Sequence, residues 1–429
     1  MSKPRYRAID RCRICGNASL MPVLDLGEQY LTGVFPRRRD DGLTRGPLEL
    51  VRCDGSDACG LVQLRHSYDH TEMYGANYGY RSSLNKSMVR HLSDKVDGLL
   101  ELVQLAPSDL VLDIGSNDGT LLSNYPVAGP TLVGMDPTAA KFRDLYRPDI
   151  RIVPDFFSAQ ALRRHFPGRR AKLVTSIAMF YDLEAPQAFA DQIASILAPD
   201  GLWHFEQSYL PAMLRTTSYD TVCHEHLEYY ALRQIKWIID RAGLKIIDVT
   251  FNAVNGGSFA ITVAPAAAPY PECTDKIRAN LDDEDRMGLR QFGTYLAFAT
   301  RVIEHKVELL KTLRDISARN MKVLGYGAST KGNVVLQYCG LSAAEIPCIA
   351  DVNSDKFGCV TPGSWIPIVS EADAKAADPD YFLVLPWHFR DNLVAREQEF
   401  LDHGGRMIFP LPGIDIVEAG LARKASSGT

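Results

Sequence analysis

The stretch VLDIGSNDGT, residues 111–120, joins an apolar run to a turn that contains two glycines. The apolar run predicts a β-strand over Asp109–Ile114, and a helix is expected after the turn. Gly115 and Gly119 allow the backbone that leaves the strand to approach a ligand closely. The stretch therefore predicts an α/β fold whose ligand site lies at the carboxyl end of its first strand.

Strand-like runs alternate with helical stretches in two blocks of the chain, which predicts a sheet of parallel strands with helices on both faces in each. In the first block the strands are predicted over Asp109–Ile114, Thr131–Met135, Lys172–Ile177 and Leu202–Glu206. In the second block they are predicted over Val323–Tyr326, Pro347–Asp351, Tyr381–Leu385 and Arg406–Pro410.

At 429 residues the chain is too long for one hydrophobic core, and we predict four parts. Residues 1–70 are short segments punctuated by Gly, Pro and Cys, which suggests a small module without a core of its own. Residues 71–268 form the first Rossmann-like domain and begin with a helix, because apolar residues recur every three or four positions from Met88 to Val103. Residues 269–320 are one or two connecting helices, and residues 321–429 form a second Rossmann-like domain.

Composition argues against several classes of protein. A formal net charge of -5 gives no general attraction to nucleic acid or to anionic membranes. The polar segment 1–13 predicts no signal peptide, and no apolar run approaches the ~20 residues that a membrane span requires. Nine cysteines, of which four are grouped, favour a reducing compartment. We therefore expect a cytoplasmic protein.

The grouped cysteines form two pairs, Cys12 with Cys15 and Cys53 with Cys59. Four thiolates suit tetrahedral Zn²⁺ and leave no open position on the metal, so the expected role is structural. The second pair has five intervening residues and is the weaker signal. His66 or His70 could replace one sulfur, and the alternative is four unrelated buried cysteines.

Acidic residues distinguish the loop at 111–120 from a dinucleotide-binding loop. Carboxylates at Asp113 and Asp118 would repel a pyrophosphate, but they suit the cationic methionine end of S-adenosylmethionine. The next predicted strand ends at Asp136, where an acidic side chain can bind ribose hydroxyls. This pattern resembles the class I methyltransferases, while a nucleotide-binding dehydrogenase is the alternative. The resemblance implies cofactor contacts from Asp113, Gly115, Asn117, Asp118, Asp136, Asp155, Phe156 and Phe157.

Reactive side chains are densest in SYDTVCHEHLEYY, residues 218–230. His224 and His226 could bind a metal with Glu225, but this spacing does not place both rings on one face of a helix. We favour proton transfer, with a histidine as general base and the neighbouring Glu orienting it or raising its basicity.

Two further loops carry candidate substrate contacts. YGANYGYRSS, residues 74–83, is either an aromatic loop over a core edge or a lid whose phenols contact the substrate. GYGASTKG, residues 325–332, has hydroxyls and a lysine at the start of a predicted helix, which suits phosphate. A Rossmann-like domain without a ligand is the alternative for this second block. The predicted substrate contacts are Tyr80, Ser82, Ser83, Asn255, Tyr326, Ser329, Thr330, Lys331, Asp351, Trp387 and His388.

Taken in order, the cysteine module, LDIGSNDG (112–119), HEH (224–226) and GYGASTKG (325–332) resemble the nucleotide-sugar C-methyltransferases, which include the 3-C-methyltransferases of branched deoxysugars. The resemblance implies a nucleotide-diphosphate 4-keto sugar as substrate, with no nucleic acid or membrane partner. It further implies His226 as the base, Glu225 as its partner and Tyr78 as a contact of the enolate. Lys331, Ser329 and Thr330 would lie near the diphosphate.

Three features depart from the family pattern. Characterised sugar enzymes usually have Tyr at the position of Cys223 and His at that of Tyr181, and we count both residues among the catalytic candidates with His224. The second cysteine pair is also wider here. A different carbon, an O-methylation, another carbonyl substrate, or a zinc-stabilised adaptor without catalysis therefore remain alternatives.

Overall fold

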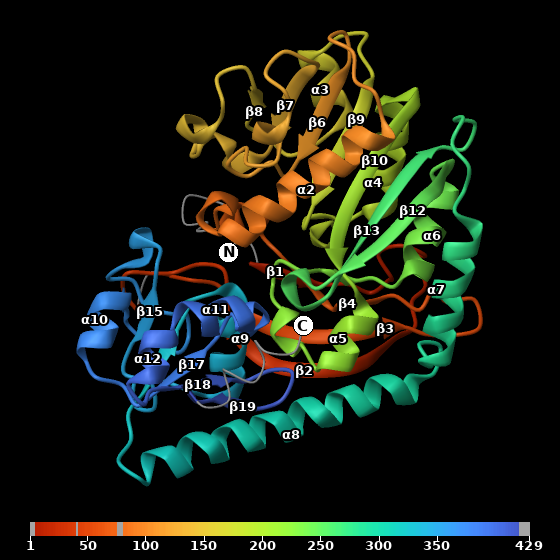
Figure 1. Cartoon of the computed structure of the whole chain (residues 1–429). Helices are drawn as coiled ribbons and strands as arrows, with labels where there is room; N and C mark the ends of the chain where they lie inside the picture. Colours follow the sequence, from red (N-terminus) through yellow and green to blue (C-terminus); the bar gives the residue numbers. More distant parts are fainter. Residues whose placement is uncertain (1–4, 40–41, 75–79, 420–429) are drawn as a thin grey trace.

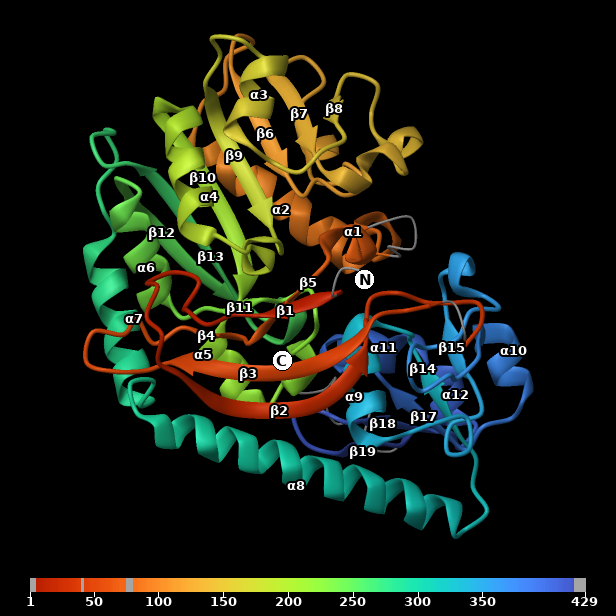
Figure 2. The same ribbon diagram turned by 180° about the vertical axis from the view of Figure 1, so that it is seen from behind.

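The computed structural model describes residues 5–39, 42–74 and 80–419. Two Rossmann-like sheets lie at different ends of the molecule, with an N-terminal antiparallel sheet between them and one long helix running beneath (Figures 1 and 2). The predicted α/β class with two Rossmann-like domains is confirmed.

The first Rossmann-like sheet has seven strands, and its middle strands follow the sequence prediction. Its order is β12 (Leu244–Asn252), β13 (Ser258–Pro265), β10 (Leu197–Ser208), β9 (Ala171–Ile177), β6 (Leu110–Ile114), β7 (Thr131–Met135) and β8 (Arg151–Val153). The four predicted strands, β6, β7, β9 and β10, are parallel as expected, but the sheet also contains β13, which was not predicted and runs antiparallel to both of its neighbours. Sequence analysis also missed the two edge strands, β8 and β12, as well as β13 beside β12.

Helices cover both faces of this sheet: α2 (Lys86–Leu102), α3 (Ala159–His165), α4 (Pro186–Ile196) and α6 (Leu232–Arg241). The predicted periodicity holds in α2, which buries Met88, Leu92, Val96 and Leu99. The expected helix after the loop at 111–120 is only a 3₁₀ turn, η2 (Leu122–Asn124).

The second Rossmann-like sheet has six strands in the order β16 (Ile368–Ser370), β15 (Ile349–Asp351), β14 (Val323–Tyr326), β17 (Tyr381–Val384), β18 (Arg406–Phe409) and β19 (Asp415–Val417). All pairings are parallel except that of β19 with β18. Its helices are α9 (Thr330–Cys339), α10 (Glu371–Ala376), α11 (Arg390–Arg396) and α12 (Gln398–Asp402).

The N-terminal module is more extensive than the predicted short segments. Its sheet has the order β11 (Glu228–Tyr229), β4 (Val62–Leu64), β3 (Arg45–Cys53) and β2 (Leu20–Tyr30), and β1 (Tyr6–Ala8) pairs separately with β5 (His66–Tyr68). A short helix, α1 (His70–Met73), follows. Its buried residues join the hydrophobic core that extends into both Rossmann-like domains, so the module shares its core with them.

The N-terminal sheet and the connecting helices both contact the second Rossmann-like domain. The backbone N–H of Tyr30 at the end of β2 donates a 2.8 Å hydrogen bond to Gln337 of α9, and Asn333 Nδ2 donates to the Thr32 carbonyl at 2.7 Å. The predicted connecting helices are α7 (Thr274–Arg286) and α8 (Phe292–Ser317), and α8 packs on β2, α9 and β14. The short helix α5 (Leu210–Thr216) lies near the N-terminal sheet (Figure 1).

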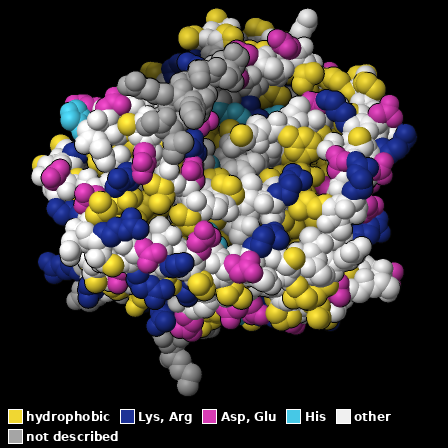
Figure 3. Space-filling model, turned by 60° about the horizontal axis from the view of Figure 1, so that its bottom comes forward, with side chains coloured by type: hydrophobic (Ala, Val, Ile, Leu, Met, Phe, Trp, Pro, Cys, Tyr) yellow, Lys and Arg dark blue, Asp and Glu magenta, His cyan; other side chains and the backbone are white. Residues whose placement is uncertain are grey.

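A membrane span would require a long apolar helix, and a uniformly charged surface would require side chains of one charge to gather on it. Within the described ranges, every helix is too short or too polar to cross a bilayer. On the face drawn in Figure 3, Lys and Arg side chains alternate with acidic ones instead of gathering in one area.

Candidate active site

A cavity of about 1410 Å³ opens between the two Rossmann-like domains. Its walls come from the residues that follow the carboxyl ends of β6, β7, β9 and β10 on one side and of β14, β15 and β17 on the other. Parallel α/β sheets bind ligands at these ends of their strands. Both domains therefore present their ligand-binding edges to one shared space.

The loop after β6 has the backbone expected for a ligand cradle. Gly115 has a φ of +74°, and a Cβ at this position would lie 3.2 Å from Met179 Cγ. The side chain of Asp113 is buried in the cavity wall, accepts a 2.6 Å hydrogen bond from Thr175 Oγ1, and has its pKa raised to about 7 by burial. Asp136 accepts from the Asn117 N–H at 2.9 Å and lines the cavity at the end of β7.

These residues fit S-adenosylmethionine. Asp113 and Asp136 give this wall of the cavity an acidic character that complements the sulfonium and ammonium charges. One carboxylate oxygen of Asp136 accepts from both the N–H and the hydroxyl of Thr138, whereas the other accepts only from the Asn117 N–H and has further acceptor capacity for a ribose hydroxyl. Phe156 and Phe157 line the cavity beyond β8, where an adenine could pack.

Several predicted contacts of the cofactor or substrate instead support the loop from behind. Asp118 does not line the cavity, because its carboxylate accepts from the Ser83 N–H at 2.9 Å and from Thr120 Oγ1 at 2.6 Å. The Ser82 N–H donates to Asn117 Oδ1 at 3.1 Å. Ser83 thus braces the loop from outside the cavity, whereas Ser82 and Asn117 hold the loop and also line the cavity, as predicted.

The other predicted contacts, Asp155 after β8 and the tyrosines at 78 and 80, have different outcomes. Asp155 is exposed and is not part of the cavity wall, where Phe156 and Phe157 lie. Tyr80 does line the cavity, and its carbonyl accepts from Asn117 Nδ2 at 3.2 Å. Tyr78 lies outside the described residues.

His226 has the geometry of a general base. Its Nδ1 lies 2.8 Å from the Thr221 carbonyl oxygen, which can only accept, so Nδ1 carries the proton and Nε2 keeps its lone pair. The residue lines the cavity, and its ring centroid lies 4.3 Å from that of Tyr181. Burial, with the nearby charge of Lys331, lowers the pKa of His226 to about 3 and keeps the ring neutral.

The neighbours of His226 differ from expectation. The partner that orients its ring is the Thr221 carbonyl, whereas the Glu225 carboxyl lies against Thr32 and Cys223 at the cavity wall. Burial raises the pKa of Glu225. His224 is fully buried away from the cavity, with its ring 4.6 Å from that of Tyr68, so a joint metal site with His226 does not form.

The other two departures from the family pattern lie close to the base. Tyr181 lines the cavity in the 3₁₀ turn η5 (Phe180–Asp182), and its carbonyl accepts from the Leu227 N–H at 2.8 Å. Cys223 is fully buried behind the wall, and burial raises the pKa of its thiol.

The second domain contributes most of its predicted residues to the cavity. Ser329, Thr330, Lys331, Asp351 and His388 all line it, as does Asn255 from the first domain. The Ser329 side chain caps α9 by accepting from the Gly332 N–H at 3.0 Å. Asp351 accepts from the Ala328 N–H at 2.9 Å, so it closes the loop after β14.

Two predicted substrate contacts in this domain lie elsewhere. Tyr326 is buried outside the cavity, and its hydroxyl donates to Glu397 at 2.6 Å. Trp387 also lies outside the wall, where its Nε1 donates to Asp220 at 2.8 Å and joins the two domains. Both side chains are bound to buried carboxylates, which motif reasoning could not anticipate.

A polar network that the sequence analysis missed forms another part of the cavity wall. Glu206 at the end of β10 accepts hydrogen bonds from His91 at 2.7 Å, Lys95 at 2.6 Å and Asn252 at 2.6 Å. Glu206 and His91 line the cavity. The spacing of His91 and Lys95, four residues apart on the predicted helix, was the available signal.

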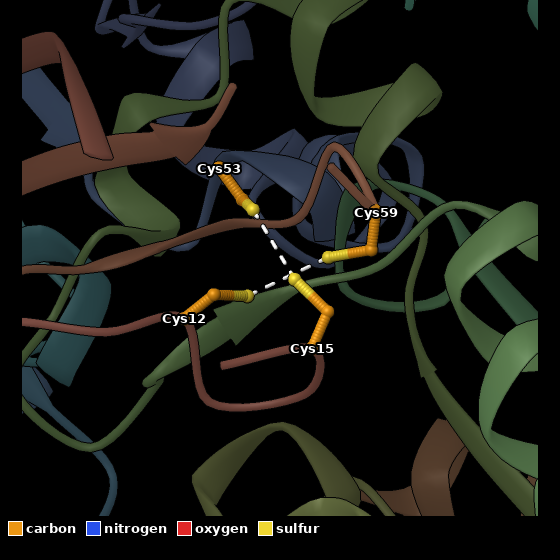
Figure 4. Close-up of side chains that lie close together, drawn as sticks. All are labelled: Cys12, Cys15, Cys53 and Cys59. Carbon is orange, nitrogen blue, oxygen red and sulfur yellow. Dashed lines mark hydrogen bonds between the residues drawn. The ribbon is translucent and has the colours of Figure 1, made fainter. Parts of the chain in front are cut away.

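The four grouped cysteines converge on one point (Figure 4). The sulfur atoms of Cys12 and Cys59 lie 3.5 Å apart, those of Cys15 and Cys53 lie 3.4 Å apart, and all four lie within 4.8 Å of one another. Tetrahedral zinc with Zn–S distances of about 2.3 Å requires sulfurs about 3.8 Å apart. The set fits zinc, and the described chain adds no histidine to it.

The short distances between the four thiols also indicate that a cation binds between them. Hydrogen bonds among the sulfurs, together with burial, raise the pKa of Cys12 to about 12 and raise that of Cys59 as well. Four thiols at this spacing cannot all ionise unless a metal compensates their charge.

Comparisons with known proteins agree with this architecture. Residues 253–412 match the family model of the C-methyltransferase C-terminal domain, residues 84–249 that of a methyltransferase domain, and residues 12–74 that of a proposed zinc binding domain. C-methyltransferase NovU of Streptomyces niveus is 34% identical over 419 residues, which covers 96% of this chain and 98% of that protein.

A solved structure of an S-adenosylmethionine-dependent methyltransferase from Clostridium acetobutylicum is 13% identical, with a TM-score of 0.33 over 41% of this chain and 92% of that one. The relationship to NovU extends over nearly the whole of both chains. The protein described here belongs to the C-methyltransferase family, as an S-adenosylmethionine-dependent enzyme with a structural zinc site.

Proposed function

We propose that this enzyme methylates the carbon next to the carbonyl of a nucleotide-linked 4-keto sugar, with His226 as general base. The observation that carries the proposal is the state of the His226 ring. Its Nδ1 proton is held by the Thr221 carbonyl, so Nε2 is left as an acceptor at the cavity wall. A group that removes a proton needs such a free lone pair within reach of its substrate.

Each domain presents a different kind of ligand-binding loop to the cavity, which supports the binding of two ligands there. Residues 71–268 would hold S-adenosylmethionine against Gly115 and Asp136, and residues 321–429 would hold the nucleotide sugar. A volume of about 1410 Å³ exceeds the range of about 300–1,000 Å³ that is typical for one small ligand. Asp113 and Asp136 of the first domain suit a cation, and the hydroxyl-rich loop at 325–332 suits an anion.

The chemistry follows from these placements. A carbonyl acidifies the neighbouring C–H, whose proton passes to His226 Nε2 while the bonding electrons form an enolate. Bound S-adenosylmethionine supplies an electrophilic methyl group, and the electrons of the methyl–sulfur bond leave with sulfur as the carbonyl re-forms. Tyr181, against the base, and Glu225, behind it, would shape the pocket around the reacting carbon.

The proposal is tested with purified protein, S-adenosylmethionine and a panel of nucleoside-diphosphate 4-keto sugars, analysed by mass spectrometry and NMR. We expect one methyl group on carbon and exchange of the neighbouring C–H with solvent deuterium. His226→Ala should lower kcat about 10²–10⁴-fold without weakening S-adenosylmethionine binding, whereas the exposed control His165→Ala should not.

Other outcomes would contradict the proposal in different ways. A methyl group on oxygen, without deuterium exchange, would identify an O-methyltransferase. Turnover of a carbonyl compound that is not a sugar would keep the chemistry and replace the substrate. Absence of turnover with the whole panel would favour an adaptor without catalysis.

A further inference from the structure

The amino-terminal end of α9 lies beside the segment that carries the base. α9 packs against the 3₁₀ turn η6 (Tyr219–Thr221), whose last carbonyl orients His226. A Cβ at Gly33 would collide with Glu225 Oε1 and would contact Thr330 Oγ1 at 3.5 Å, so Thr330 and Glu225 approach the same point. The start of α9 therefore lies close to Glu225 and to the turn that orients the base.

Lys331, at the start of α9, reaches across the boundary between the two domains. Its Nζ donates a 2.7 Å hydrogen bond to the Asn255 carbonyl of the first domain, and both residues line the cavity. An ammonium group has three donors, so two remain for a ligand. The charge of Lys331 adds to burial in lowering the pKa of His226 and of His388, which is expected when the ammonium faces both rings across one space.

The other cations of the second domain at the cavity already have anionic partners. Lys356 lies 3.5 Å from Asp351 and donates to the Ala328 carbonyl at 2.7 Å, while Arg396 pairs with Glu371 and with Glu397. In the described ranges, no carboxylate forms an ion pair with Lys331. Burial lowers the pKa of Lys331, and the charge of the nearby Asp220 carboxyl opposes this effect without an ion pair between the two side chains. The ammonium of Lys331 can therefore still take a new negative charge beside His226.

The same cavity has another basic surface to which phosphate groups could bind. Arg81, Lys86 and Arg90 line it at the start of α2, and none of them forms an ion pair in the part of the chain that is described. A diphosphate can be neutralised there, which leaves Lys331 for a different oxygen.

The reaction requires a positive charge near the substrate carbonyl. A neutral imidazole whose pKa is lowered by burial is a weak base, and it cannot remove a carbon-bound proton unless the enolate is stabilised. Prepositioned donors at such an oxygen are most effective in a site that excludes water, because they need no reorganisation during the reaction.

We propose that Lys331 is a catalytic residue whose ammonium donates a hydrogen bond to the substrate carbonyl oxygen and stabilises the enolate that His226 generates. This inference rests on the proposed function. The C–H bond breaks with its proton on His226 Nε2, and its electron pair forms a C=C bond as the carbonyl π electrons move to the oxygen facing Lys331. When carbon–methyl bond formation returns these electrons, the carbonyl re-forms and Lys331 keeps its proton.

The test compares Lys331→Met with Lys322→Met. Lys322 belongs to the same domain but precedes β14, at the opposite end of the strand from the cavity, so both variants lose one positive charge. The measurements are kcat and KM for methyl transfer, the rate of solvent deuterium exchange into the keto sugar with S-adenosylhomocysteine bound, and the Kd of thymidine diphosphate by calorimetry.

We expect Lys331→Met to lower kcat and the exchange rate together by about 10²–10³-fold, the usual loss for one donor to an oxyanion, with the Kd of thymidine diphosphate unchanged. Lys322→Met should match the wild type. A tenfold or greater weakening of thymidine diphosphate binding, or a rise in KM at unchanged kcat, would assign Lys331 to the diphosphate and overturn the inference. An inactive wild-type enzyme would instead refute the proposed function, and the inference would fall with its premise.

Discussion

Glu206→Gln should destabilise the first domain by about 3 kcal/mol at pH 7. Glu206 is buried, which by itself would raise its pKa, but the hydrogen bond from His91 and the charge of Lys95 outweigh burial and lower the pKa from 4.5 to about 2. Each pKa unit corresponds to about 1.4 kcal/mol, so the ionised carboxylate contributes about 3 kcal/mol. The substitution removes that charge and places an amide against three donors.

The sign of the pH dependence follows from a carboxyl group whose pKa is lower in the folded state. Its contribution is fully present above pH 4.5 and is lost as the pH falls through about 2. The difference in unfolding free energy between wild type and Glu206→Gln should therefore be constant from pH 8 to pH 5 and should shrink below pH 4.5.

Urea unfolding followed by tryptophan fluorescence measures this difference, since Trp203 is fully buried on the same strand, β10. The control Glu101→Gln lies exposed on α2 and should change the free energy of unfolding by less than about 0.5 kcal/mol. A loss below 1 kcal/mol at pH 7, or a difference that grows on acidification, would show that the network does not stabilise an ionised Glu206.

Two further substitutions test the metal site and the domain contact. Cys15→Ser should reduce zinc below one ion per chain by elemental mass spectrometry and lower the Tm, because metal binding is coupled to folding of the module, whereas Cys348→Ser should retain the metal. Trp387→Phe removes the donor to buried Asp220 and should cost about 1–3 kcal/mol in urea unfolding; an effect no larger than that of Trp237→Phe, on α6, would argue against this contact.

Local patterns were sufficient for the centre of each sheet. The strands β6, β7, β14 and β17 lie within one residue of their predicted limits, because buried parallel strands are continuous apolar runs. The edge strand β12 was missed, since it is half-buried and its residues do not form such a run. The antiparallel course of β13 depends on pairing with β10, which is far away in the sequence.

The candidate site residues also fall into those whose position the sequence could predict and those whose position it could not. Gly115 and Asp136 follow strands directly, so their position at the cavity could be predicted from the order of elements alone. Asp118 and Trp387 also follow strands, but their side chains bind partners on other elements, Ser83 and Asp220, that no motif connects to them. Whether such a side chain points into the cavity or away from it depends on which buried polar group it can bind. That group becomes its neighbour only in the packed structure.

The sequence by itself determined the two Rossmann-like domains, the four cysteines of the metal site and the segment that contains His226, because each depends on residues close together in the chain. Only the tertiary structure decided that both domains open into one cavity, that the Thr221 carbonyl orients the base, and that Lys331 crosses to the Asn255 carbonyl beside it. The cavity and the contact of Lys331 with Asn255 form between elements that are distant in the sequence, whereas Thr221 lies only five residues before His226. The backbone between Thr221 and His226 has no regular secondary structure, so its course depends on the packing of the shared core.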